Sequence, residues 1–383
     1  MKIVIACDSF KGSLSSLEAG KAVEQAALEV FPEAEVIVSP LADGGEGTAQ
    51  ALLEGLGGKV IRCDVQNPLG ETIEAEYVLT DNNIAVIDIA AAAGLTLIEP
   101  ERRNPLEAST FGVGQMIDNA IRRGCRDFII GLGGSATVDG GVGMLEALGL
   151  KFYNRFGDRI RGLKGADVAE IKHIDFSDGN RHIPQCRFRI ACDVDNPLCG
   201  SNGAARVFGP QKGADEKAVE LLDTALADLA DVVKMKFHAD YKNEPGAGAA
   251  GGLGWAFMTF LNGTLEKGTD IVADATDLRQ KLEGASIFVT GEGKIDSQSV
   301  CGKAPVSAAK LAKEAGAVTV AFCGCAGEGA AAVGAAGIDA FFPILQQLVP
   351  EEQALEPATA AANLRATALQ YFKAVQSAAA LQQ

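Results

Sequence analysis

The two ends of the chain carry the same order of predicted elements, and this order restricts the fold more than any other feature of the sequence. The N-terminal part predicts a strand in KIVIAC, a loop, a helix through Val30 and a strand in AEVIVSP. The C-terminal part predicts strands in ASIFVTG, VTVAFCG and IDAFFPIL, separated by helices. Short strands that alternate with helices are typical of a doubly wound parallel sheet, and neither end alone has enough strands. We therefore expect an α/β protein with a flavodoxin-like domain built from both chain ends.

The middle of the chain follows a different pattern. TIEAEYVLT and NIAVIDIA predict an antiparallel pair that turns around Asp81, and helices, further strands and glycine loops follow. We expect two domains: a discontinuous flavodoxin-like domain of residues 1–58 and 284–383, and an inserted mixed-sheet α/β domain of residues 59–283. Because ligands often bind between domains, we expect the active site in the cleft between them.

Composition and charge disfavour several classes of partner. With 383 residues, of which 48% are hydrophobic, the chain can form roughly two compact domains. The formal net charge of −16 disfavours binding to nucleic acid and to anionic membranes, and no cluster of Lys or Arg offsets it. An anionic ligand must therefore be held by backbone N–H groups, a few placed basic side chains or a divalent cation. We expect small-molecule partners, and a homodimer is left open.

Cysteine usage and the apolar segments indicate the cellular compartment. The nine cysteines are scattered and form no C-x-x-C motif, which is typical of reduced thiols in a cytosolic protein. MKIVIACDS reaches an acidic residue after five apolar positions, so it predicts a first strand rather than a signal peptide. The longest apolar stretch, residues 84–98, is broken by Asp88 and Gly94 and is too short to span a bilayer. We expect a cytoplasmic protein.

The segment IIGLGGSATVDGGVGMLEALG, residues 129–149, predicts an anion site. Its glycines let the backbone turn tightly and approach a ligand, and the helix that follows would point unpaired N–H groups at a bound phosphate or carboxylate. Gly131, Gly133 and Ala136 match the dinucleotide fingerprint weakly, but no strand ending in an acidic residue follows about 20 positions on. A second weak match, which begins at Gly246, does not follow a predicted strand.

Several common catalytic motifs are absent from the sequence. The chain has three histidines, and it contains no H-E-x-x-H, no G-x-S-x-G and no Walker motif. Zinc hydrolases, triad hydrolases and P-loop enzymes are therefore disfavoured.

Glycine occurs together with Asp or Glu and with Lys, Ser or Thr in several loops, mostly at the ends of predicted strands. Carboxylates can hold Mg²⁺ or accept the proton of an attacking hydroxyl, lysines can neutralise a transferred phosphoryl group, and glycine N–H groups can hold phosphates. Each residue taken singly is explained equally well as a helix cap, an Asx turn or a solvated lysine. The loops are DSFKGS, LADGGEGT, GGSATVDGG, ACDVDNP and TGEGKIDSQSVCGK. Taken together, they favour phosphoryl transfer.

The ordered motifs of the chain resemble those of the bacterial glycerate kinase family, the type that belongs with the glyoxylate and glucarate pathways. They cover nearly the whole chain and are DSFKGSLSS, PLADGGEGT, GLGGSATVDGGVGMLEALG, ACDVDNPLCG, VFGPQKGA, PGAGAAGGLG and TGEGKIDSQSVCGKAP. The resemblance implies an ATP-dependent, Mg²⁺-requiring kinase that phosphorylates D-glycerate and forms 2-phosphoglycerate. It also implies a two-domain α/β fold with one flavodoxin-like domain.

Candidate catalytic residues lie within these motifs. Asp193 or Asp296 is expected to accept the proton of the glycerate hydroxyl. Lys11, the third catalytic candidate, is expected to balance phosphate charge together with Lys303.

Candidate ligand-binding residues lie in the same motifs. Asp43 and Glu46 are expected to hold Mg²⁺ or the substrate hydroxyls, and Asp139 and Glu292 are further metal candidates. The loop of residues 131–141 is expected to hold either the ATP phosphates or the substrate carboxylate. Residues expected to bind substrate or phosphate are Asp8, Ser9, Gly133, Gly134, Ser135, Lys212 and Lys303.

Two other functions stay open at this point. An NAD(P)-dependent dehydrogenase of a small hydroxy acid would use the weak dinucleotide match, although the acidic ribose partner is missing. A non-catalytic sugar-acid binding protein would keep the ligand site but consume no ATP.

Overall fold

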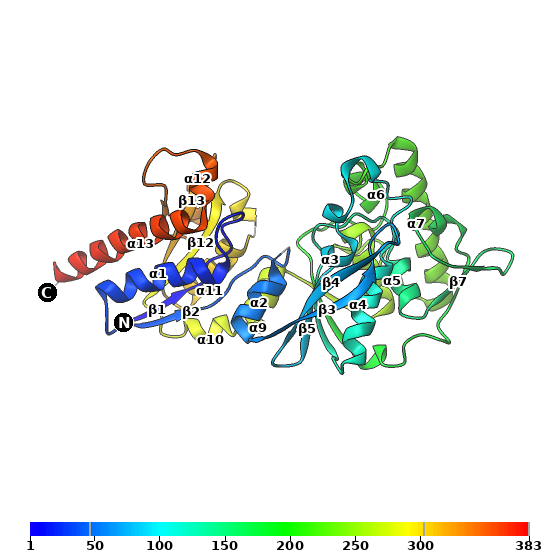
Figure 1. The fold of residues 1–383 in the computed structure, drawn as a ribbon, viewed down its shortest axis with the longest axis horizontal. Helices are drawn as coiled ribbons and strands as arrows, with labels where there is room; N and C mark the ends of the chain where they lie inside the picture. The colour runs from blue at the N-terminus through cyan, green and yellow to red at the C-terminus, as the bar shows by residue number, and fades with distance from the viewer. Residues whose placement is uncertain (46, 302, 382–383) are drawn as a thin grey trace. The chain divides into compact units, whose positions relative to one another are not determined.

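The computed structural model describes residues 1–45, 47–301 and 303–381 (Figure 1). The chain divides into two compact units. Unit 1 comprises Met1–Asp43, Gln50–Leu56 and Thr269–Gln383, and unit 2 comprises Gly44–Ala49 and Gly57–Gly268.

Unit 1 contains a five-stranded sheet in which every pair of neighbouring strands is parallel. The strand order is β14-β13-β12-β1-β2. Numbered along the chain within this sheet, the order is 2-1-3-4-5, which is the flavodoxin-like order. The predicted parallel sheet from both chain ends is therefore confirmed. Its strands are β1 (Lys2–Ile5), β2 (Glu35–Val38), β12 (Ile287–Ile295), β13 (Val318–Ala326) and β14 (Ala340–Pro343).

Helices cover both faces of this sheet because side chains alternate between the faces along each strand. Ile3 and Ile5 pack in one apolar cluster with residues of α1 and α13, which lie side by side in Figure 1. Val4 packs in another cluster with residues of α9, α10 and α11. The helices are α1 (Ser16–Val30), α2 (Thr48–Leu56), α9 (Gly268–Ala275), α10 (Leu278–Leu282), α11 (Ala304–Glu314), α12 (Glu351–Leu355), α13 (Pro357–Ala380), and the 3-10 helices η7 (Ser299–Cys301) and η8 (Ala330–Ala336).

Hydrogen bonds at its first turn define where α1 begins. The Ser15 hydroxyl accepts a hydrogen bond from the Glu18 N–H, and the Glu18 carboxylate accepts one from the Ser15 N–H. This capping box satisfies backbone donors that have no partner inside the helix. The loop between β1 and α1, which holds DSFKGS, therefore ends at a fixed point.

The boundary between the units differs from the one expected from the sequence. Residues 269–283 were expected in the inserted domain, but they group with unit 1. The reason is packing, because Ala273, Leu278 and Leu282 are buried in the same cluster as Phe288 of β12. An amphipathic helix pattern alone does not say which sheet the helix will cover.

Unit 2 contains a six-stranded mixed sheet of order β11-β10-β6-β5-β4-β3. The pairs β11-β10, β10-β6 and β6-β5 are parallel, whereas the pairs β5-β4 and β4-β3 are antiparallel. The predicted antiparallel pair is thus present as β4 and β5. The strands are β3 (Gly58–Gln66), β4 (Thr72–Thr80), β5 (Ile84–Asp88), β6 (Asp127–Gly131), β10 (Arg187–Ala191) and β11 (Thr264–Glu266).

A small antiparallel sheet of order β8-β7-β9 completes the strands of unit 2, with bounds Lys151–Tyr153 for β7, Arg159–Ile160 for β8 and His173–Asp175 for β9. The α-helices of unit 2 are α3 (Ala90–Ala93), α4 (Phe111–Arg122), α5 (Val142–Ala147), α6 (Ala204–Phe208), α7 (Glu216–Phe237) and α8 (Leu253–Phe260). Its 3-10 helices are η1 (Leu95–Leu97), η2 (Pro100–Arg102), η3 (Gly165–Glu170), η4 (Ile183–Gln185), η5 (Pro210–Lys212) and η6 (Ala249–Gly251).

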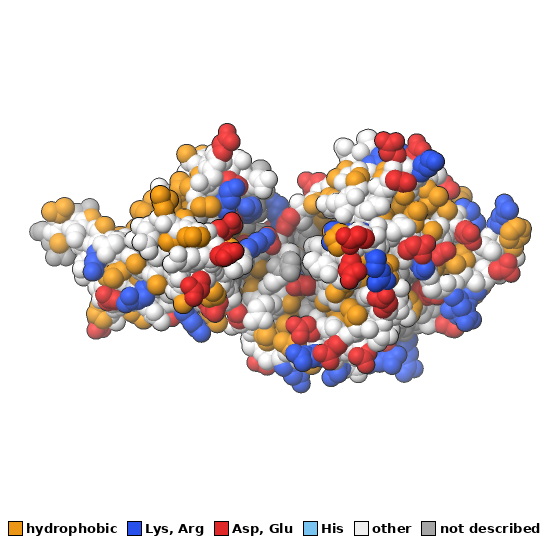
Figure 2. All heavy atoms as spheres, turned by 45° about the horizontal axis from the view of Figure 1, so that its top comes forward, with side chains coloured by type: hydrophobic (Ala, Val, Ile, Leu, Met, Phe, Trp, Pro, Cys, Tyr) orange, Lys and Arg blue, Asp and Glu red, His pale blue; other side chains and the backbone are white. Residues whose placement is uncertain are grey.

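Most of the charged residues of the sequence are spread over the surface of the protein. Acidic and basic side chains are intermingled over the face drawn in Figure 2. Within the part of the chain that the structure describes, none of the helices combines the length and the apolar character needed to cross a membrane.

Leu364 tests the packing of the C-terminal helix α13 in the core of unit 1. Its side chain is fully buried, so Leu364→Ala is expected to lower the free energy of unfolding by about 2–5 kcal/mol through the cavity it leaves. Lys373→Ala, at an exposed position of the same helix, should change it by about 0.5 kcal/mol or less. Urea unfolding followed by circular dichroism measures both variants, and equal effects would contradict this packing.

Candidate active site

Unit 1 has a cavity at the carboxyl ends of its central strands. Its volume is about 570 Å³. It lies where the strand order reverses between β1 and β12, which is the place where open α/β sheets bind ligands. We call it the unit 1 cavity. Its polar lining consists of Asp8, Ser9, Lys11, Ser13, Asp43, Glu292, Lys294, Lys303 and Asn363, and its apolar lining includes Phe10, Ile344, Leu345, Val349, Ala354, Leu355 and Ala360.

Asp8 lies in this cavity, three residues beyond the end of β1, and is 9% exposed. Its N–H donates to the Gly291 carbonyl (2.8 Å), which ties the loop to β12. Burial, assisted by the neighbouring carboxylates of Asp43 and Glu292, raises the pKa of Asp8 to about 7. A carboxyl group in this state would become fully ionised if a cation bound beside it.

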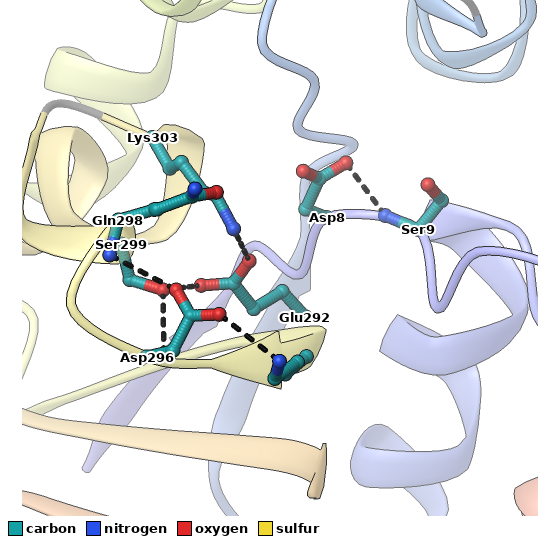
Figure 3. Close-up of polar contacts among 8 residues, drawn as sticks. Asp8, Ser9, Glu292, Asp296, Gln298, Ser299 and Lys303 are labelled. Carbon is teal, nitrogen blue, oxygen red and sulfur yellow. Dashed lines mark hydrogen bonds and ion pairs between the residues drawn. The ribbon is translucent and has the colours of Figure 1, made fainter. Parts of the chain in front are cut away.

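Glu292 of β12 is 5% exposed and holds two neighbouring side chains in place (Figure 3). One carboxylate oxygen accepts a hydrogen bond from the Ser299 hydroxyl (2.7 Å). The other pairs with Lys303 Nζ (3.2 Å). Lys303 is the residue just before α11, and about a third of its side chain is exposed. Glu292 therefore orients a lysine at the polar end of the cavity.

Asp296 has a different environment from the one expected of a proton acceptor. Asp296 is not among the described residues that line the unit 1 cavity. Its carboxylate accepts a hydrogen bond from the Gln298 N–H (2.9 Å) and lies 3.4 Å from Lys294 Nζ. The Gln298 N–H and the lysines Lys294 and Lys303 hold the pKa of Asp296 below its usual value. Such a carboxylate is a weak base and stabilises the turn.

Unit 2 has its own cavity of about 420 Å³, which we call the unit 2 cavity. It lies at the carboxyl ends of the parallel strands β6 and β10. The residues that line it are Gly44, Gly45, Leu95, Leu132, Gly133, Gly134, Ser135, Ala191, Cys192, Asp193, Val194, Phe208, Gln211, Lys212, Ala249 and Ala250.

The glycine loop after β6 is held by the segment after β5. The Leu95 N–H donates to the Gly134 carbonyl, and the Ala136 N–H donates to the Ala93 carbonyl, both at 2.8 Å. Gly134 has φ +72°, a conformation that L side chains rarely adopt. The sequence-predicted residues Gly133, Gly134 and Ser135 therefore come to the cavity wall together.

Lys212 is 2% exposed and lies in the wall of the unit 2 cavity. Its Nζ donates to Ser135 Oγ and to the Thr137 carbonyl, both at 2.7 Å. Burial lowers the pKa of Lys212 to about 7, although Asp139 acts in the opposite direction.

Asp139 is fully buried, and its carboxylate is occupied by four donors. These are the Thr110 N–H (2.9 Å), the Thr110 hydroxyl (2.8 Å), the Gly141 N–H (3.0 Å) and the Gly143 N–H (3.3 Å). Burial raises the pKa of Asp139, and these hydrogen bonds act against the rise. The geometry thus gives Asp139 a structural role at the start of α5, in place of the metal ligand expected from the sequence.

The other acidic candidates are divided between the two units. Asp193 is exposed, follows β10 in the unit 2 cavity and accepts a hydrogen bond from the Gly268 N–H (3.3 Å). Asp43 lies in the unit 1 cavity. Glu46 lies outside the described residues. Among the residues that are described, no three His, Cys, Asp or Glu side chains are grouped as ligands for a metal ion.

Sequence reasoning missed the apolar half of the unit 1 cavity and Ser299. The apolar residues Ile344, Leu345 and Val349 follow β14, and Leu355 belongs to α12. A signal was present, because Ile344 and Leu345 are the last residues of the predicted strand IDAFFPIL, at the end where parallel sheets bind ligands. The contact of Ser299 with Glu292 has no sequence signal.

Comparisons with known proteins agree on one family. The model of the Glycerate kinase family matches residues 3–376. The chain is 44% identical to the glycerate kinase of Haemophilus influenzae over 91% of this chain and 92% of that protein. It is 42% identical to the glycerate 2-kinase of Escherichia coli K12 over 94% of each chain.

A solved structure agrees with these relatives. A protein from Salmonella typhimurium LT2 assigned the name glycerate kinase 2 is 40% identical to this chain, with a TM-score of 0.90 over 99% of each chain. None of these names supports the dehydrogenase or the sugar-acid binding protein.

Asp139 and Asp193 are expected to respond differently to truncation. Asp139→Ala leaves buried N–H and O–H donors without an acceptor, so it should lower the free energy of unfolding by about 3 kcal/mol or more. Asp193→Ala removes an exposed side chain and should change it by about 0.5 kcal/mol or less. Urea unfolding of both variants tests this assignment. A stable Asp139→Ala protein would contradict the structural role.

Proposed function

Because this chain belongs to the glycerate kinase family, we propose that it transfers the γ-phosphate of ATP to the 2-hydroxyl of D-glycerate, forming 2-phosphoglycerate and ADP. The observation that carries the proposal is the family match over residues 3–376. The choice of the 2-hydroxyl is supported by the name of the Escherichia coli relative, glycerate 2-kinase. Each unit has a cavity at the carboxyl ends of its parallel strands, and a kinase needs sites for two substrates.

The nucleotide is assigned to the unit 1 cavity because this cavity has two chemically different ends. The apolar side chains after β14 and on α12 suit the flat face of a purine base. Lys11, Lys294 and Lys303 at the other end suit a triphosphate. The Glu292 carboxylate keeps Lys303 at this end through its ion pair.

Mg²⁺ fits the same end of the unit 1 cavity. Mg²⁺ is usually bound by one or two carboxylates together with substrate phosphates and water, so a site made of protein groups alone is not required. Asp8 and Asp43 both line the cavity, and their mutual repulsion contributes to the raised pKa of Asp8. A cation between them would remove this repulsion. We therefore assign Asp8 and Asp43 to the metal, which would neutralise charge on the phosphates.

Glycerate is assigned to the unit 2 cavity. This cavity brings a hydroxyl, a carboxylate and a lysine together, from Ser135, Asp193 and Lys212. A hydroxy acid needs a cation for its carboxylate and a proton acceptor for its reacting hydroxyl. Lys212 serves the first need and Asp193 the second, while the backbone of Gly133 and Gly134 offers N–H groups.

Phosphoryl transfer is then mainly positioning and charge stabilisation. The glycerate oxygen attacks the γ-phosphorus as the bond to the ADP oxygen breaks, and Asp193 takes the hydroxyl proton. Lys11 and Lys303, which both line the unit 1 cavity, are expected to balance the phosphoryl charge.

The proposed function is tested with the purified chain, ATP, Mg²⁺ and D-glycerate. ADP release is followed by a coupled assay, and the product is identified by ³¹P NMR. We expect ADP release that depends on D-glycerate and stops when EDTA removes the metal. ATP consumption without a phosphorylated glycerate product would overturn the proposal, and a 3-phosphoglycerate product would overturn the choice of hydroxyl.

Two Asp→Asn variants separate the candidate proton acceptors. Asp193→Asn should lower kcat by about 100-fold or more, because it removes the base. Asp296→Asn should keep kcat within about tenfold, because the amide oxygen can still accept the Gln298 N–H. Steady-state kinetics at saturating substrates measures both effects, and circular dichroism confirms folding. A large loss in Asp296→Asn together with a small loss in Asp193→Asn would exchange the two roles.

A further inference from the structure

Lys212 is a buried amine whose hydrogen-bond partners among the described residues are neutral. Among the residues that the structure describes, its Nζ donates to Ser135 Oγ and to the Thr137 carbonyl and to no other acceptor. Within the described part of the chain, no Asp or Glu oxygen forms an ion pair with Lys212. A buried ammonium without a carboxylate partner is costly, because it loses its hydration and gains no opposite charge.

The titratable groups around Lys212 do not supply the missing charge. The Asp139 carboxylate acts to raise the pKa of Lys212, but four hydrogen-bond donors already occupy this carboxylate. Asp193 lies in the same cavity but is exposed to solvent. Burial raises the pKa of the Cys192 thiol to about 11, so this thiol is neutral. Gln211 and Ser135, which also line the cavity, carry no charge.

We infer that Lys212 is largely uncharged in the ligand-free protein at mildly alkaline pH and takes up a proton there when the carboxylate of glycerate enters the unit 2 cavity. This inference rests on the proposed function, since it takes glycerate to be the ligand of this cavity. The step is NH₂ plus H⁺ giving NH₃⁺, with the proton drawn from solvent. The substrate anion then provides the partner that the protein itself does not.

Glycerate binding and the protonation of Lys212 affect each other, and the direction of this effect follows from the neutral and the protonated state of the amine. The pKa of Lys212 in the free protein is about 7, and a neighbouring carboxylate raises it. The D-glycerate carboxyl is fully ionised between pH 6 and 8 and brings no proton. Binding therefore takes up protons above about pH 7, and by linkage the affinity for glycerate falls as the pH rises through this value.

A proton acceptor at this position would give the opposite pH dependence. If neutral Lys212 accepted the hydroxyl proton, kcat would rise as the pH increased through about 7. If Lys212 binds the carboxylate, kcat/KM for glycerate falls over the same range while kcat changes little. The sign of the pH profile therefore separates the two roles.

Calorimetric titration of the full chain with D-glycerate, without ATP, measures the coupling directly. The heat is recorded in buffers of different ionisation enthalpy, and its dependence on that enthalpy gives the protons taken up per glycerate bound. From a pKa of about 7 in the free protein, we expect about 0.9 protons at pH 8, about 0.5 at pH 7 and about 0.1 at pH 6.

Three variants complete the design. Lys212→Met and Lys212→Gln should abolish the uptake and raise the KM for glycerate by about tenfold or more. Lys234→Met is the matched control, because Lys234 lies in the same unit and pairs with Asp240, outside the cavity lining. It should behave as the wild type. Circular dichroism melting confirms that each variant is folded, and the wild-type measurement stands without them.

Each result decides for or against the inference. Uptake that rises with pH and depends on Lys212 supports it. A wild-type chain that phosphorylates D-glycerate but binds it without proton uptake overturns the inference and leaves the proposed function intact. Uptake that depends on Lys212 with a non-hydrolysable ATP analogue, and not with glycerate, also overturns it. A chain that neither binds nor phosphorylates D-glycerate overturns the proposed function and the inference together.

Discussion

The parallel pairing of β1 with β12 is the constraint on which the unit 1 cavity depends. The register joins Ile3 to Ile287 and Ile5 to Val289, so the two ends of the chain must meet before the sheet exists. This pairing creates the reversal of strand order at which the cavity lies. It also brings Asp8, in the loop that follows β1, close to Glu292 of β12. Without it, neither the metal candidates nor the lysine held by Glu292 would share a site.

The sequence predicted this sheet because each strand is short, β-branched or aromatic, and bounded by loops. It also predicted the loops of the site, because glycine, carboxylate and lysine recur where strands end. It did not predict the side of the unit boundary on which α9 and α10 fall, since their apolar faces suit either sheet. Asp139 shows a second limit, because a carboxylate saturated by backbone donors and one free to bind a ligand have the same sequence signature.

Asp139 and Lys212 show two ways of placing an ionisable group in the interior of unit 2. Asp139 accepts four hydrogen bonds, so its charge is stabilised by fixed donors and it rigidifies the start of α5. Lys212 has two neutral acceptors, and no carboxylate in the described part of the chain forms an ion pair with it. The first arrangement is complete without a ligand. The arrangement around Lys212 lacks an anionic partner. A ligand that supplies this partner at the cavity wall stabilises the folded protein by binding there.

Because the chain is acidic, anionic substrates must be bound by individual groups inside each cavity. A net charge of −16 opposes the approach of anionic substrates, but at physiological salt this repulsion is screened beyond about 8 Å. Recognition of a carboxylate or phosphate is therefore decided inside each cavity, where screening is weak. The two cavities differ in this respect, since Lys303 forms an ion pair with Glu292, whereas among the described residues the partners of Lys212 are neutral. The first lysine is ready for an anion before it arrives, and the second becomes charged with it.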